Sequence, residues 1–244
     1  LHFIDYLDVL DEATDNAVLD EEQRRWIAER LPVSEAQVAP RLDLMSAYMT
    51  LLGARCLDVG AGVGQYLVAL EAQGAKPEGI EVSALRRQFA LEKFGLKLHA
   101  RPVESPCWQT RSGDFDMLTF WDVIEHVNDP LATVRSAWRL LRPGGLLALE
   151  TPSREVLSYT LSQRCYRLTR GRLSLFLRNF YDLAPFGHKQ IFTRSQLVSL
   201  LSGNGFRILY AHTVYPSDAG GRFLRPQDKI ILVAEKVAAQ AMGT

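Results

Sequence analysis

From residue 55 onward, short apolar runs alternate along the chain with segments in which apolar residues recur at helical spacing. The runs predict strands and the amphipathic segments between them predict helices. This order is typical of a mostly parallel sheet with helices on both faces. The predicted strands are 55–60, 76–82, 96–100, 115–122, 146–151, 206–215 and 229–236, and the predicted helices between them are 63–74, 84–94, 130–141 and 194–204.

The first 52 residues lack this alternation and predict a helical cap, which leaves an α/β domain over residues 53–244. A helix is expected from Asp20 to Leu31, closed by Pro32, and a second from Ser34 to Leu52, broken near Pro40. Residues 1–19 suit a short helix or an arm. The cap either covers one face of the sheet or helps to close a binding site, and the sequence favours neither.

A long insertion at 153–192 follows the fifth predicted strand and contains no strand pattern of its own. Arginines alternate in it with leucine, tyrosine and phenylalanine. Three interpretations remain open: an amphipathic lid whose arginines are solvated or paired with the acidic cap, a contact with a membrane surface, or a site for an anionic acceptor. Substrate choice is expected to depend on this segment.

Composition narrows the function classes. The chain has 244 residues, 47% of them hydrophobic, and a formal net charge of zero, which fits one domain with additions and gives no basic excess to indicate nucleic acid as a partner. Residues 1–50 hold eleven acids against four Lys/Arg, whereas 153–195 hold eight Lys/Arg against two acids. An odd set of three cysteines and the lack of an apolar run of membrane-spanning length favour a reducing, cytoplasmic location.

Three alternating glycines follow the first predicted strand in the stretch Asp58-Val-Gly-Ala-Gly-Val-Gly64. Glycine accepts positive φ and carries no Cβ, so backbone and ligand can approach closely where a strand passes into a helix. Gly60, Ala61, Gly62 and Gly64 therefore predict a small-molecule cradle.

Glu81 ends the second predicted strand about twenty residues later, where an acid can accept hydrogen bonds from the two hydroxyls of a ribose. The glycine spacing is G-x-G-x-G rather than the G-x-G-x-x-G of dinucleotide sites, and no Lys-Ser/Thr pair follows, as a P-loop requires. Asp58 would repel a phosphate but suits a cationic ammonium or sulfonium group. The residues therefore favour S-adenosylmethionine as the cofactor.

With these motifs the chain resembles the class I S-adenosylmethionine-dependent methyltransferases over residues 40–236. The resemblance rests on Leu57-Asp-Val-Gly-Ala-Gly-Val-Gly64, Gly79-Ile-Glu-Val-Ser83, the segment 115–126 and Leu141-Arg-Pro-Gly-Gly-Leu146. The tail 188–206 resembles the small-molecule branch, which includes quinone-biosynthesis and sugar methyltransferases. The resemblance implies a Rossmann-like, seven-stranded, mostly parallel sheet of order 3-2-1-4-5-7-6 with its last strand antiparallel, a helical insertion after strand five, and the product S-adenosylhomocysteine.

The resemblance also implies residue roles around that cofactor. Asp58, Gly60 and Gly62 would hold the methionine part, Glu81 the ribose and Val82 the adenine. Val103 and Glu104 would flank the adenine edge, although Pro102 stands where many relatives carry an acid. The reactive methyl would lie near Asp122, Val123 and Ile124.

The expected reaction is methyl transfer by in-line displacement to an oxygen, nitrogen or carbon atom of a small-molecule acceptor, either anionic or apolar. A base is required only where the acceptor must lose a proton, and His126, then His188, are the candidates. Neither histidine belongs to a set of ligands with zinc-type spacing, so no metal is expected. A membrane-bound lipid or quinone acceptor and a protein that binds the cofactor without catalysis are the alternatives, and the oligomeric state is open.

Overall fold

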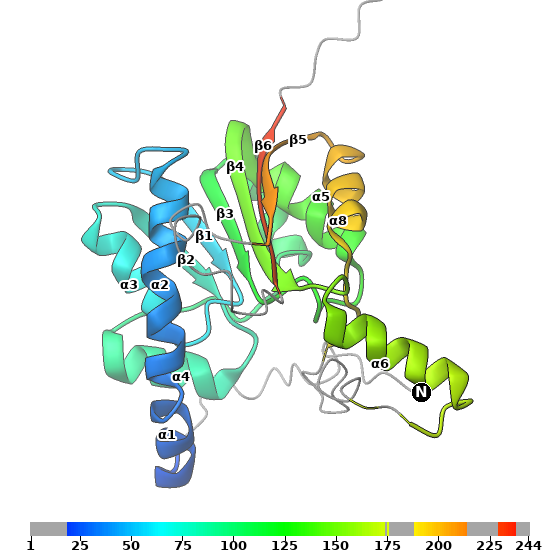
Figure 1. Cartoon of the computed structure of the whole chain (residues 1–244). Helices are drawn as coiled ribbons and strands as arrows, with labels where there is room; N and C mark the ends of the chain where they lie inside the picture. Colours follow the sequence, from blue (N-terminus) through cyan, green and yellow to red (C-terminus); the bar gives the residue numbers. More distant parts are fainter. Residues whose placement is uncertain (1–18, 174, 176–187, 214–228, 238–244) are drawn as a thin grey trace, which may run out of the picture.

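A computed structural model of the chain describes residues 19–173, 175, 188–213 and 229–237 (Figure 1). These residues contain one six-stranded sheet of order β2-β1-β3-β4-β6-β5. The first four strands are parallel, and β6 runs antiparallel to both of its neighbours, as expected for the last strand. The strands are β1 Arg55–Val59, β2 Lys76–Ile80, β3 Phe115–Trp121, β4 Leu141–Pro152, β5 Phe206–His212 and β6 Lys229–Lys236.

The observed order equals the expected one without its third strand, so the prediction of a strand at 96–100 is wrong. Only one bridge forms there, in which His99 N–H donates to Gly79 O and Glu81 N–H donates to His99 O. The segment lies between Gly95, which ends the preceding helix at φ 70°, and Pro102, which has no N–H to donate. Its partner strand β2 ends at Ile80, and little length is left for a ladder.

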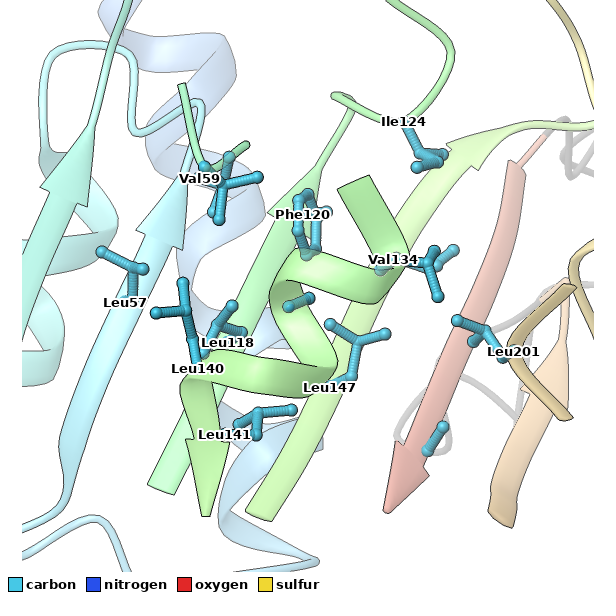
Figure 2. Close-up of a cluster of buried hydrophobic side chains, with 14 of the residues drawn as sticks. Leu57, Val59, Leu118, Phe120, Ile124, Val134, Leu140, Leu141, Leu147 and Leu201 are labelled. Atoms are coloured by element: carbon cyan, nitrogen blue, oxygen red, sulfur yellow. The ribbon is translucent and has the colours of Figure 1, made fainter. Parts of the chain in front are cut away.

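Helices cover both faces of the sheet, and each face has its own buried cluster (Figure 1). On one face, α5 (Pro130–Leu140), α8 (Arg194–Ser202) and the 3₁₀ helix η3 (Pro106–Arg111) pack on alternate residues of the strands. Figure 2 shows Val134 and Leu140 of α5 meeting Leu118 and Leu147 of two strands. On the other face, α2 (Leu31–Ser46) and α3 (Gln65–Ala72) pack on residues such as Met117. Burial on both faces accounts for the mostly apolar composition of the central strands.

The described part of the predicted cap contains α1 (Glu21–Ala28) and α2, and the predicted boundaries of its helices need correction. Pro32 does not close a helix but lies in the first turn of α2, where its missing N–H costs nothing. Pro40 lies inside α2 without ending it. The helix α1 begins at a capping box of Asp20 and Gln23 and packs against α4 (Ala84–Phe94). The prediction for residues 1–18 lies outside the described residues.

The insertion contains one described helix, α6 (Leu157–Leu168), which follows β4 and extends away from the sheet at the carboxyl ends of the parallel strands (Figure 1). Tyr159 and Ser162 are buried among those side chains of α6 that the structure describes. Among the helices that the structure describes, none is both long and apolar enough to cross a membrane. Residues 176–187 of the insertion lie outside the described part.

Candidate functional site

Two adjoining cavities open at the carboxyl ends of β1, β2 and β3, between the sheet and the cap. The larger has a volume of about 700 Å³ and the smaller of about 390 Å³. Their shared walls contain residues of α1, the glycine turn, α4 and the loop after β3: Trp26, Ile27, Gly60, Arg86, Asp122 and His126. Ligands of open α/β sheets bind at this end of the strands.

The glycine turn follows β1 as predicted, and its three glycines have positive φ values of 77°, 59° and 87°. A Cβ on Gly60 would lie 2.3 Å from Val123 Cγ2, so this position must stay glycine for packing. A Cβ on Gly62 would meet nothing within 4 Å, because this residue lines the smaller cavity. Gly64 lines neither cavity and instead begins α3, with Leu96 where its Cβ would be. Of the residues predicted to form the cradle, Gly60, Ala61 and Gly62 line the smaller cavity.

Glu81 lies in the larger cavity directly after β2 and is 3% exposed. Gly62 N–H donates to its Oε2 at 2.9 Å, and Ser83 N–H donates to its Oε1 at 2.8 Å. Burial raises the pKa of this carboxyl group, while Arg86 and the two N–H donors oppose that rise. Each oxygen keeps a second lone pair, so the group can still accept two hydrogen bonds from a ligand.

Asp58 is the last polar residue of β1 and lines the smaller cavity, where it is 3% exposed. Thr119 of β3 donates to its Oδ1 at 2.6 Å. Burial raises the pKa of Asp58 to about 7, against the lowering effects of Thr119 and Arg41. A cation placed in the smaller cavity would restore the carboxylate form, because an opposite charge favours ionisation.

The far wall of the larger cavity contains the residues predicted for adenine. Val82, Val103 and Glu104 line it together with Pro102, so the departure at Pro102 adds a rigid apolar surface there. Thr133 of α5 donates a short hydrogen bond to Glu104 Oε1. Val123 also lines this cavity, whereas Ile124 is 1% exposed and belongs to the core.

Asp122 lies where both cavities meet and belongs to a network of four charged side chains that the sequence did not reveal. Its Oδ2 accepts from Arg41 at 3.1 Å and from Lys229 at 2.7 Å. Glu150 Oε1 accepts from the same two cations at 3.2 and 2.6 Å. The backbone of Asp122 has φ 58°, and its N–H donates to Glu150 O. The network ties the cap helix α2 to β3, β4 and β6, and Arg41 also lines the smaller cavity.

His126 and His188 come together, although 62 positions separate them in the sequence. Their ring centroids lie 4.9 Å apart, and His126 lines both cavities, whereas His188 lines neither. Glu125, which the sequence analysis did not single out, lies beside them, with its Oε1 3.9 Å from His126 Nε2. The donor atoms of the three side chains lie within 4.8 Å of one another.

Comparison with known proteins agrees with this arrangement. A family described as "Methyltransferase domain" matches residues 23–211. The ubiquinone biosynthesis O-methyltransferase of Xanthomonas oryzae pv. oryzae is 35% identical over 127 residues, which are 50% of this chain and 53% of that protein. The chain thus spans about half the length of the curated relatives it matches.

Solved structures show the same fold at low sequence identity. The putative methyltransferase in complex with the Haloferax volcanii Trm112 activator has a TM-score of 0.62 and 15% identity, with 91% of this chain and all of that chain covered. The [4+2]-cyclase SpnF has a TM-score of 0.57 and 21% identity, with 82% of each chain covered. These likenesses support the fold alone, because a fold hosts more than one chemistry.

The family match covers most of the chain, including the cap helices and the strand ends that border both cavities. A glycine cradle, a buried acid at the end of β2 and a second acid at the end of β1 agree with the nucleoside cofactor predicted from the sequence. The chain belongs to the S-adenosylmethionine-dependent methyltransferase family.

Proposed function

We propose that this protein transfers the methyl group of S-adenosylmethionine to an oxygen, nitrogen or carbon atom of a small-molecule acceptor. The observation that supports this most is the pair of adjoining cavities, each with a buried acid of the kind that one half of the cofactor requires. Glu81 suits the ribose diol of the adenosyl half, and Asp58 suits the ammonium group of the methionine half. Binding of this cofactor would raise the ionised fraction of Asp58.

Within this proposal, the adenine lies along Val82 and Val103 in the larger cavity, near Glu104. The methionine end lies over Gly60, Ala61 and Gly62, where the absence of a Cβ on Gly62 leaves room for it. Arg41 lines the smaller cavity, as do these three residues, and it suits the carboxylate of the methionine end. The larger cavity, at about 700 Å³, has the size of an ordinary small-molecule site.

When bound, S-adenosylmethionine supplies an electrophilic methyl group on a cationic sulfur. The chain's own residues supply position, and alignment of this kind contributes roughly 7–11 kcal/mol in favourable cases. Asp122 and His126 line both cavities at their junction, where the methyl group would lie, and Val123 lines the larger cavity beside them. His126 is the proposed base for an acceptor that must lose a proton, with His188 packed against it. Ile124 has no direct contact with the cofactor in this proposal, because its side chain is buried in the hydrophobic core.

The test is transfer of label from S-adenosyl-L-[methyl-³H]methionine to small molecules extracted from cells, separated into an aqueous and a lipid fraction. We expect label in one fraction and release of S-adenosylhomocysteine, both abolished in E81A. Binding of S-adenosylhomocysteine by calorimetry without transfer to either fraction would favour a non-catalytic binding protein. No binding at all would contradict the proposal.

A membrane-associated lipid or quinone is the second candidate acceptor, because the insertion presents apolar and basic side chains side by side to solvent. Leu161 is 56% and Leu168 is 85% exposed on α6, and Tyr166 is 44% exposed between them. The exposed arginines of the same stretch are Arg164, Arg167, Arg170 and Arg172. Apolar and cationic groups together favour adsorption to a surface of anionic lipids.

Co-sedimentation with vesicles distinguishes this candidate from a lid whose arginines are merely solvated. We expect binding to vesicles that contain phosphatidylglycerol but weak binding to pure phosphatidylcholine, and loss of binding in L161E/L168E. Leu52 is 75% exposed and directly precedes β1, at the other end of the strands, so L52E is the matched control and should bind as the unmodified protein does. Equal binding by all variants would remove the membrane contact.

The division into a cap at 1–52, a methyltransferase domain at 53–244 and a lid at 153–192 is part of the same proposal. So is a reducing, cytoplasmic location, which the free state of Cys56, Cys107 and Cys165 supports. Neither metal nor nucleic acid has a role in it.

A further inference from the structure

Glu125 is a buried acid to which the proposed function gives no role. It lies in the loop after β3, and its side chain is 0% exposed. Thr151 of β4 donates to its Oε2 at 2.8 Å, but its Oε1 accepts no hydrogen bond from any residue that the structure describes. That second oxygen lies 3.9 Å from His126 Nε2. An unsatisfied buried polar atom in a native fold calls for an explanation, and a catalytic role is among the common ones.

The backbone of Glu125 fixes the second histidine beside the first. Its carbonyl oxygen accepts from Lys189 N–H at 2.9 Å and from Gln190 N–H at 3.2 Å. The Gln190 side chain also donates to Val127 O at 3.1 Å. These bonds attach the segment that returns from the insertion to the loop after β3. They hold the His188 ring against the His126 ring, at 4.9 Å between centroids.

The charges around Glu125 bring its titration into the range of an imidazole. Burial, followed by the negative charge of Asp122, raises the pKa of Glu125 to about 8, and the Thr151 bond and the Lys229 charge oppose that rise. A histidine ordinarily titrates at ~6.5. Where two neighbouring groups interact strongly, they bind protons as a pair rather than independently.

From this geometry we infer that Glu125 is a positioning residue whose Oε1, 3.9 Å from His126 Nε2, orients the imidazole electrostatically as the base toward the methyl acceptor. The inference rests on the proposed function. In the step, the O–H or N–H bond of the acceptor breaks and its proton goes to His126 Nδ1, while Nε2–H stays on the imidazole and faces Glu125 Oε1. The acceptor electron pair forms the bond to the methyl carbon, and the pair of the broken carbon–sulfur bond stays on sulfur.

Nuclear magnetic resonance of the histidine Cε1–H protons tests the pair on the whole protein without an acceptor. The His126 signal is assigned by its absence in H126Q. We expect it to show an inflection near pH 8 in the unmodified protein, where Glu125 titrates. In E125Q that inflection should disappear. The signal of His99, whose ring contacts Glu78 at 3.1 Å, is the internal control and should be the same in both proteins.

A second measurement covers the case in which E125Q does not fold. Coupling between two sites is reciprocal, so removal of the imidazole must change the titration of the acid. His126 is 33% exposed and H126Q should fold. We expect the ¹³Cδ signal of Glu125 to titrate at higher pH in H126Q, because the variant lacks the imidazolium that stabilises the carboxylate.

Three results would overturn the inference: a His126 titration identical in the unmodified protein and E125Q, a Glu125 titration unchanged in H126Q, or an inflection that requires Zn²⁺ and vanishes with EDTA. Failure of the proposed function is seen separately. It would appear as absent binding of S-adenosylhomocysteine by the unmodified protein, since Glu125 lines neither cavity and E125Q should bind this ligand normally.

Discussion

Replacing Glu81 by glutamine keeps the size of the side chain but removes half of its hydrogen-bonding capacity toward a ribose. The carboxylate uses one lone pair of each oxygen for Gly62 N–H and Ser83 N–H, which leaves one lone pair on each for a ribose hydroxyl. In glutamine, the Nε2 group has no lone pair. One ribose hydroxyl and one backbone N–H therefore lose their acceptor.

The expected loss follows from these bonds. A hydrogen bond to a charged group contributes about 1.5–3 kcal/mol, and 1.4 kcal/mol corresponds to a tenfold change in affinity. The dissociation constant of S-adenosylhomocysteine should thus rise about 10- to 100-fold in E81Q. The unsatisfied N–H should also lower the free energy of unfolding by about 1–3 kcal/mol, because the site is buried.

Isothermal titration calorimetry at a temperature where all proteins are folded measures the affinities. Glu78 lies on β2, three residues before Glu81, and pairs with Arg111 at 2.6 Å, but it lines neither cavity, so E78Q is the matched control. We expect E78Q to bind as the unmodified protein does. An E81Q dissociation constant within about threefold of the unmodified value would refute the assignment of Glu81 to the ribose. Even the weakest hydrogen bond in the range above, at about 1.5 kcal/mol, predicts a rise of about tenfold.

Three further predictions concern the cradle and the buried charges. In calorimetry, G62A should bind the cofactor at least tenfold more weakly than the unmodified protein. Gly53 also has a positive φ and open space around its Cβ position, so G53A should lose about 1 kcal/mol of stability but keep its cofactor affinity. Equal binding by both variants would contradict the cradle. The raised pKa of Asp58, about 7, means that stability present at low pH is lost as pH rises through 7, so ligand-free D58N should melt above the unmodified protein at pH 8 and near it at pH 4. R41M breaks the buried ion pair of Arg41 with Glu150 and should lower the free energy of unfolding, measured in urea, by about 3–5 kcal/mol. R55Q breaks the exposed pair with Asp114 and should lower it by less than about 1 kcal/mol. Similar losses in the two variants would show that the buried network contributes little.

The sequence predicted those parts of the fold whose causes are local. The observed bounds of α4 and β6 equal the predicted ones, because a serine cap and a glycine stop delimit α4 and a continuous apolar run marks β6. The glycine turn after β1 was also predicted, since only glycine accepts three positive φ values so close together. In each case the residues that decide the structure are neighbours in the chain.

The parts that were missed depend on distant partners. The ion pairs of Arg41 and Lys229 with Asp122 and Glu150 join residues 79 to 109 positions apart, and no local pattern indicates them. A charged residue inside the apolar run of β4 was the available signal for Glu150. The strand predicted at 96–100 is missing for a related reason. Its apolar pattern is present in the sequence, but the number of residues that can pair depends on where the neighbouring strand β2 ends.

A crystal structure with S-adenosylhomocysteine bound tests the central claim most directly. The account predicts that both ribose hydroxyls lie within hydrogen-bonding distance of the Glu81 carboxylate, with the adenine along Val82 and Val103 and the ammonium group facing Asp58. A ligand bound elsewhere, or one whose ribose does not contact Glu81, would contradict it.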